Sequence, residues 1–426
     1  MTTPQGFQDA FFAFTYTFLL EPPIDLIKLA AGARRFFSGK LPRGAIRVRD
    51  GSGDGDHVEA FLALRCPECD VPFGPYQCDL QLRLYDETRH RYVRRVIEGL
   101  SLSWQVRVLQ SGVGTVTFYL GREPSWEVGI GEAIAISRAA TVVSPQAEAG
   151  RLAFGPSSSI TRLFPSQRER GTFFGLFCGT VRNLAKGARI RWAEIAWKMV
   201  VPGAVFANPY VTIRLELPSQ VATVGDLLSD TNWRNDLARV VLRVRQEWKQ
   251  VNQSYVARQM DSLASCTPHD RYWLSLHLRS CTYMYCMDAY TADGYPRAYF
   301  RSLLDTIELL RAQWHAYTVY GEYLDGLLHE LSGPDVLARW TSARSVLSDI
   351  AKARRQLASC LESPISHKRA AGSLQEVFAQ GLDVFGIERL EALVLRKLQM
   401  VDRLYSDLLE LSRAAELSTL LPSKLP

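Results

Sequence analysis

Three cysteines in the first fifth of the chain have a spacing that could bind zinc. Cys66 and Cys69 form a Cys-x-x-Cys pair, and eight residues separate Cys69 from Cys78. Zinc takes four ligands in a tetrahedron, and a hairpin that carries three thiolates would supply three of them. No fourth ligand stands at a recognised spacing, although His57 and His90 lie nearby. The alternatives are a zinc site built on Cys66, Cys69 and Cys78, and a hairpin with three ordinary cysteines.

A basic segment between residues 151 and 191 has the residue types that bind an anion. Residues 151–200 contain nine Lys and Arg against two Asp and Glu, and the whole net charge of +6 falls within residues 1–220. Guanidinium forks, hydroxyl groups and backbone N–H groups hold phosphates and carboxylates. We expect the segment to bind an acidic partner, either protein, nucleic acid or nucleotide. Its candidate cations are Arg162, Arg168, Arg170, Arg182, Lys186, Arg189 and Arg191.

Other motifs with a chemical meaning are incomplete. Residues 50–56 begin like a calcium loop, but the twelfth position is Phe61 and not a bidentate Glu. The sequence contains neither the His-Glu-x-x-His motif of zinc proteases nor the Gly-x-Ser-x-Gly of serine hydrolases. The basic segment lacks the Gly-Lys-Ser/Thr of a P-loop. No catalytic residues are predicted, and a non-enzymatic protein is favoured.

The cellular compartment is inferred from the N-terminus and from the cysteines. The chain starts without the basic region and cleavage site of a signal peptide, and the apolar run at residues 11–20 is too short to span a bilayer. Eight scattered cysteines without a secretion signal are typical of free thiols in a reducing compartment. We expect a cytoplasmic protein that does not enter a membrane.

The candidate sites of the first half depend on a domain made mostly of β-strands. Short runs rich in β-branched and aromatic residues alternate with turn residues up to about residue 218, which predicts an antiparallel sheet. Helices are expected at residues 23–37 and 131–140. The expected strands are residues 11–20, 45–49, 58–65, 78–85, 92–97, 102–109, 114–120 and 210–217.

The second half is predicted to be helical. Apolar residues recur every seven positions between residues 296 and 332, between 234 and 258, and between 387 and 411. Further helices are expected near residues 269–290 and 335–361. The fold class is therefore α+β: a β-rich domain of residues 1–220, followed at 221–426 by an antiparallel bundle of long helices with heptad seams.

The heptad seam of residues 296–332 leaves two interpretations open. Its residues either form the core of an intramolecular bundle, or they bind a protein partner or a second copy of the chain. Residues 269–300 are rich in Tyr and Trp and likewise fit a helical core or a ligand or protein interface. The candidate seam residues are Leu303, Ile307, Leu310, Trp314, Tyr317, Leu324 and Leu328.

The layout loosely resembles the soluble part of CorA-type magnesium transporters, which also place long helices after a β-rich domain. The membrane pair and the Gly-Met-Asn signature of that family are absent from this sequence, so the resemblance carries no function. The sequence favours a regulatory or scaffold protein whose helical half binds a partner or a second copy. The alternatives are nucleic-acid binding by the basic segment, and an enzyme or small-molecule sensor with a site between the halves.

Overall fold

The computed structural model describes the β-sheet and the long helices of the chain. The described residues are 6–19, 46–49, 61–64, 73–86, 88–109, 113–138, 142–145, 209–243, 271–286, 295–332 and 373–420, with the single positions 29, 31, 173, 177, 181, 254, 255 and 351.

Ten strands form one sheet, and all of its pairs but one are antiparallel. The order is β11-β12-β10-β2-β7-β6-β4-β3, with β5 paired to β6 and β9 paired to β5; β10 and β12 are the parallel pair. A short pair, β1 (Gly6–Phe7) and β8 (Val128–Gly129), lies apart from it. The ten strands are β2 (Asp9–Leu19), β3 (Ile46–Arg49), β4 (Phe61–Leu64), β5 (Phe73–Asp86), β6 (Arg91–Leu109), β7 (Val113–Gly121), β9 (Val142–Pro145), β10 (Tyr210–Glu216), β11 (Tyr272–His277) and β12 (Ser280–Tyr285).

The structure confirms the expected strands. They could be predicted because β-branched and aromatic residues recur in them with a period of two. The two runs expected at residues 92–97 and 102–109 form a single strand, β6. Gly99 lies between those runs at φ +68°, a conformation that glycine adopts without steric cost. It coincides with an irregularity in the pairing of β5 with β6, between the pairs Cys78–Leu100 and Leu80–Ile97.

Each face of the sheet packs against its own helices, as the alternation along β2 shows. Phe12, Phe14, Tyr16 and Phe18 belong to one core cluster, which also contains side chains of three short helices. Ala13 belongs to a second cluster, which contains the long helices. The short helices are α2 (Ile130–Ser137), α6 (Val224–Ser229) and α7 (Thr231–Val241).

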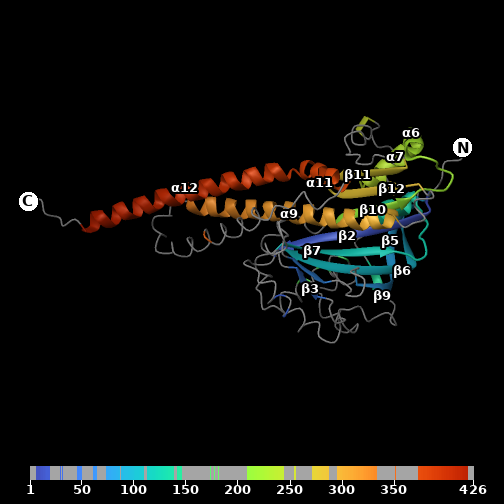
Figure 1. Ribbon diagram of the computed structural model, residues 1–426, viewed down its shortest axis with the longest axis horizontal. Coiled ribbons are helices and arrows are strands. Elements are labelled where there is room, and N and C mark those ends of the chain that lie inside the picture. Colours follow the sequence, from blue (N-terminus) through green and yellow to red (C-terminus); the bar gives the residue numbers. More distant parts are fainter. Residues whose placement is uncertain are drawn as a thin grey trace, which may run out of the picture.

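A helix of 37 residues, α9 (Tyr295–Leu331), lies over the second face of the sheet and extends beyond it (Figure 1). This helix confirms the prediction for residues 296–332. Next to it lie α11 (Ser373–Val384) and α12 (Ile387–Leu420), which are separated by Phe385 and by Gly386, the latter at φ +61°. In Figure 1, α12 (red) runs alongside α9 (orange) and continues past its end.

The long helices run in the same direction, although an antiparallel bundle was expected. Gly381 of α11 meets Leu310, whereas Lys397 of α12 meets Gly321 and Asp325, so both helices advance away from the sheet. A short connection would force antiparallel neighbours, but 41 residues separate Leu331 from Ser373, which is enough chain to return to the start of α9. The structure confirms the α+β class itself, with a mostly antiparallel sheet and long helices packed together.

The helix expected near residues 269–290 is wrong. Residues 272–285 form the hairpin of β11 and β12, and this hairpin joins the sheet next to β10. Successive side chains of the segment point to opposite faces of the sheet, as in any strand. Trp273 and Met284 belong to the first core cluster, and Leu274 and Tyr283 belong to the second. The sheet thus takes strands from both sides of residue 220. The division into two domains at that residue stays a prediction, and the helix expected at 335–361 lies outside the described residues except for position 351.

Candidate functional site

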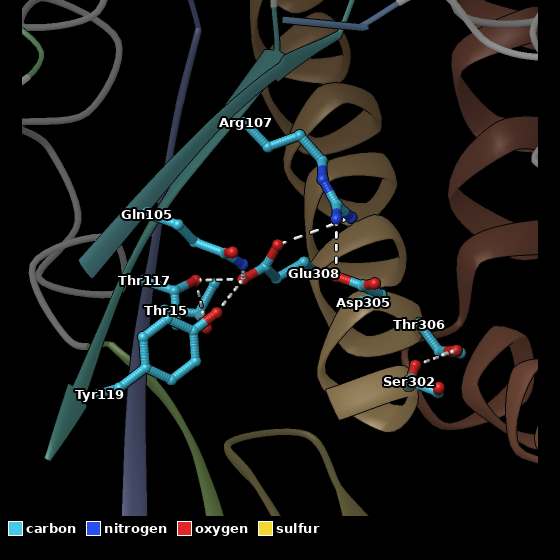
Figure 2. A network of polar contacts seen from close by, with 9 residues as sticks. All are labelled: Thr15, Gln105, Arg107, Thr117, Tyr119, Ser302, Asp305, Thr306 and Glu308. Carbon is cyan, nitrogen blue, oxygen red and sulfur yellow. Dashed lines mark hydrogen bonds and ion pairs between the residues drawn. The ribbon is translucent and has the colours of Figure 1, made fainter. Parts of the chain in front are cut away.

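A fully buried carboxylate lies where α9 crosses the sheet. Glu308 points from α9 toward β6 and β7 (Figure 2), and none of its side chain is exposed. Its Oε1 accepts hydrogen bonds from Gln105 Nε2 at 2.7 Å, from Thr117 Oγ1 at 2.5 Å and from the Tyr119 hydroxyl at 3.3 Å. Three donors on two strands therefore compensate the loss of water around this charge.

Arg107 connects two carboxylates of α9 to β6. Its Nη2 donates to Asp305 Oδ1 at 2.6 Å, and its Nη1 lies 3.6 Å from Glu308 Oε2. Burial alone would lower the pKa of Arg107, but Asp305 and Glu308 outweigh it, so the pKa is raised. The guanidinium therefore stays charged and fastens one turn of the helix to the sheet.

Local sequence rules place these groups together. Gln105 pairs with Thr117 across β6 and β7, and Arg107 pairs with Thr115, so polar side chains share one face of the sheet. On the opposite face the same strand presents Trp104 to the first core cluster. Asp305 and Glu308 are three residues apart, which puts both on one side of α9.

A second buried polar group lies one to two turns further along α9. The Arg311 guanidinium lies over the rings of Trp314, Tyr210 and Phe385, at 4.2, 5.2 and 5.5 Å from their centres. Burial lowers the pKa of Arg311 to about 10. These contacts join α9 to β10 and to the end of α11.

His315 completes the polar row of α9. Its Nδ1 lies in hydrogen-bond contact with Thr17 Oγ1 of β2, at 3.0 Å, and its side chain is not exposed. Burial, together with the nearby Arg311 charge, lowers the pKa of His315 to about 3. The imidazole is therefore neutral at pH 7.

A buried ion pair also fastens the centre of the sheet. Arg214 Nη2 of β10 lies 2.5 Å from Asp9 Oδ2, and Asp9 Oδ1 accepts from the Trp126 backbone N–H at 3.0 Å. The Arg214 guanidinium also lies over the rings of Phe11 and Phe300, at 5.3 and 5.9 Å from their centres. It thereby links β10 to the first turns of α9.

The chemistry of Glu308, Arg311 and His315 is therefore structural. A general acid, base or nucleophile must reach a substrate within hydrogen-bond distance. Glu308 and His315 have no exposed surface, and Arg311 is 7% exposed. Their hydrogen bonds and ring contacts instead set the position of α9 on the sheet.

The residues of the predicted seam are packed within the chain. Leu303, Ile307, Leu310, Tyr317 and Leu324 are buried in the second core cluster, and Trp314 and Leu328 pack against it. The side chains that fill the seam come from the sheet, α11 and α12. A partner role for these seven residues stays a prediction, while an intramolecular role accounts for their burial.

The seven predicted anion-binding cations lie outside the described residues. Three neighbours in their segment are described: Phe173, Phe177 and Val181 are helical and buried in the first core cluster. Phe173 stacks on Phe14 with ring centres 4.5 Å apart, and Phe177 stacks on Tyr16 at 5.0 Å. Their spacing of four residues matches one face of a helix. These three side chains lie on the face of the sheet opposite α9.

The zinc site stays a prediction. Cys66 and Cys69 lie outside the described residues, and of Cys78 only the backbone is described, in β5 opposite Leu100. Within the described ranges, no three His, Cys, Asp or Glu side chains are grouped as a metal site would require. Within the same ranges, no helix is long and apolar enough to cross a bilayer.

Sequence reasoning missed the polar row of α9, although two signals for it exist. Glu308, Arg311 and His315 recur at spacings of three and four within an otherwise apolar stripe. Polar residues also alternate along the two strands beneath them, at Gln105 and Arg107 and at Thr115 and Thr117. Matching a polar helix row with a polar strand face would have predicted that the two elements meet.

One apolar face of α12 is exposed. Leu393, Met400 and Leu411 are 45%, 51% and 54% exposed, and Leu404 is half-buried between them. At about 100° per residue these four side chains fall within about 40° of one another around the helix. The buried row that packs toward α9, which includes Val394 and Val401, lies roughly a quarter turn away. Helix α12 thus carries a second apolar stripe, defined as Leu393, Met400, Leu404 and Leu411.

Comparison with models of known protein families, with curated proteins and with solved structures found no match to this chain.

Proposed function

We propose that the chain is a non-enzymatic scaffold protein whose long helices pair with a second copy of itself. The observation that carries the proposal is the second apolar stripe of α12. The four side chains follow one another at spacings of seven, four and seven residues, which fit the seven-residue repeat of a face that a partner helix packs against in a coiled coil. Exposed apolar side chains in one row mark an interaction surface more often than isolated ones do.

The stripe is self-complementary in an antiparallel pair. Leu393 and Leu411 are each nine residues from position 402, and Met400 and Leu404 are each two residues from it. A twofold axis through position 402 therefore sets Leu393 of one copy against Leu411 of the other, and Met400 against Leu404. Every exposed apolar residue of the stripe meets an apolar residue.

Charge complementarity supports the same register. Lys397 and Asp407 are each five residues from position 402 and flank the stripe on either side. In the antiparallel pair, Lys397 of one copy faces Asp407 of the other, at both ends of the contact. The Lys397 ammonium group lies 2.6 Å from Asp325 of its own α9, and this ion pair fixes the position of the ammonium group at the edge of the stripe next to α9. A parallel pair would instead set each Lys397 against the other.

The helical anchor on the sheet supports a scaffold role. Glu308 and Arg107 hold α9 to the sheet, the Arg214 guanidinium lies over the ring of Phe300 in α9, and Lys397 holds α12 to α9. A pair formed through α12 would therefore fix the distance and orientation of two β-sheet domains. A cytoplasmic location belongs to this proposal, since eight scattered cysteines are typical of a reducing compartment.

The basic segment remains part of the proposal as a second surface for an acidic partner. What supports it is the local excess of cations in residues 151–191, among which the described Phe173 and Phe177 are buried against the sheet. Glu substitutions at Arg182, Lys186 and Arg189 should weaken any such binding and its dependence on salt.

Sedimentation velocity over a concentration series tests the self-pairing. The full-length protein should form a dimer, and Met400→Glu should shift it to the monomer because two charges would enter the centre of the contact. Leu395→Glu is the matched control. Leu395 is 37% exposed on the same helix but lies about 200° around it from Leu393. A monomer at all concentrations, or equal effects of the two variants, would contradict the proposal.

A further inference from the structure

The β5–β6 hairpin ends in a two-stranded ribbon, here residues 81–97, whose two faces differ in chemistry. Its inner face contributes Leu82, Leu84 and Ile97 to the first core cluster. Arg95 on the same face pairs with Glu132 of α2 at 2.6 Å. The inner face is therefore occupied by the chain itself.

The outer face consists of an aromatic pair next to an arginine pair. Tyr85 lies opposite Tyr92, with ring centres 5.3 Å apart, and Arg83 lies opposite Arg94. Tyr92 is 46% exposed, Val96 beside the arginines is 41% exposed, and both guanidinium side chains are exposed. Side chains two residues apart on a strand share a face, so these groups form one continuous surface.

The arginine pair is unfavourable in the isolated chain. Like charges directly opposite each other on neighbouring strands destabilise the sheet. Among the residues that the structure describes, neither Arg83 nor Arg94 has a carboxylate within ion-pair distance, whereas Arg89 at the ribbon's tip pairs with Asp86 and Arg95 with Glu132. An anion bound between the two guanidinium groups would remove this repulsion.

We propose that the outer face of the ribbon binds single-stranded nucleic acid. Arg83 and Arg94 would hold a phosphate, and the exposed Tyr92 ring would stack on the adjacent base. Single-strand binding surfaces combine cations along the backbone with aromatic rings that accept any base. The aromatic pair favours a nucleic acid over an acidic peptide, because carboxylates need the arginines but not a stacking ring. This surface is separate from α12 and does not depend on self-pairing.

Fluorescence anisotropy with a labelled oligo-uridine strand tests the proposal in the full-length protein. Tyr92→Ala should weaken binding by about 5- to 150-fold, the usual value of one stacked base, whereas Tyr92→Phe should retain it. Replacing Arg83 and Arg94 together by Gln should reduce the slope of log affinity against log salt by about 0.7, the value for one phosphate of a single strand. These side chains are exposed or half-buried, so the variants should fold as the parent does.

A control double variant distinguishes binding at this site from a general effect of positive charge. Arg389→Gln with Arg396→Gln removes two exposed arginines from α12 and should leave the affinity unchanged. No binding at low salt would overturn the proposal, as would equal losses in the two double variants. Equal affinity for a poly-glutamate peptide, unaffected by Tyr92→Ala, would overturn it in favour of an acidic protein partner.

Discussion

Arg107 of β6 binds Asp305 of α9 at 2.6 Å, although their positions in the chain differ by 198. The contact closes a network that continues through Glu308 to Thr117 and Gln105. A buried charge network of this kind selects one position of the helix on the sheet, because any shift leaves a charge unpaired. It therefore determines the direction in which α9, and with it α12, leaves the sheet.

Removal of the Glu308 carboxylate should destabilise the fold strongly. Glu308→Ala leaves Gln105 and Thr117 without their acceptor and Arg107 with one carboxylate instead of two. We expect the free energy of unfolding to fall by about 3–5 kcal/mol, measured by urea denaturation. Glu322→Ala is the control: Glu322 is exposed on the same helix, and its loss should cost less than about 0.5 kcal/mol. Similar losses for both variants would contradict the anchor role of Glu308.

His315 should make the fold less stable in mild acid. Its pKa is about 3 in the folded protein and 6.5 for the unperturbed side chain, so below pH 6.5 only the unfolded chain takes up its proton. The free energy of unfolding therefore decreases as the pH is lowered from about 6.5 to about 3. Between pH 6.5 and 5 the loss from this group should be roughly 2 kcal/mol.

The variant His315→Gln isolates this contribution. It removes the titrating group while keeping a polar side chain near Thr17, so its unfolding free energy should depend less on pH between 6.5 and 5 than that of the parent. The measurement is denaturation at several pH values. Parallel pH profiles for parent and variant would show that His315 titrates normally and is not buried as described.

Two glycines of the long helices should respond to alanine in opposite ways. A Cβ at Gly381 would lie 2.3 Å from Leu310 Cδ1, in a closely packed contact between α11 and α9. Gly381→Ala should therefore cost about 1–3 kcal/mol. A Cβ at Gly326 of α9 would meet no atom within 4 Å, and Gly326→Ala should stabilise by about 0.5–1 kcal/mol. Thermal unfolding measures whether each variant is less or more stable than the parent. If Gly381→Ala left the stability unchanged, the close contact between α11 and α9 would be contradicted.

Strands and the long helix could be predicted because their patterns are local. Alternation marks β7, and a seven-residue repeat from Leu303 to Leu331 marks α9. The hairpin of β11 and β12 was mistaken for helix because residues 272–285 are short apolar runs without polar alternation, which buried strands share with buried helices.

The buried polar site and the direction of the helices could not be predicted in the same way. The partners of Glu308 lie about 190 to 200 residues earlier in the chain, and no local period reports such contacts. The parallel course of α9 and α12 depends on how the chain returns between Leu331 and Ser373, which a heptad pattern does not encode. The predictions on zinc and on the cations of residues 151–191 stay predictions.

Disulfide formation in the double variant Leu393→Cys with Leu411→Cys tests the antiparallel pairing of α12 most directly. The two positions lie about 27 Å apart along one helix, so a bond between them must join two copies. After oxidation and digestion, mass spectrometry should find the peptide of position 393 linked to that of position 411. Links between two copies of position 393, or the absence of links at these positions, would contradict the proposed pairing.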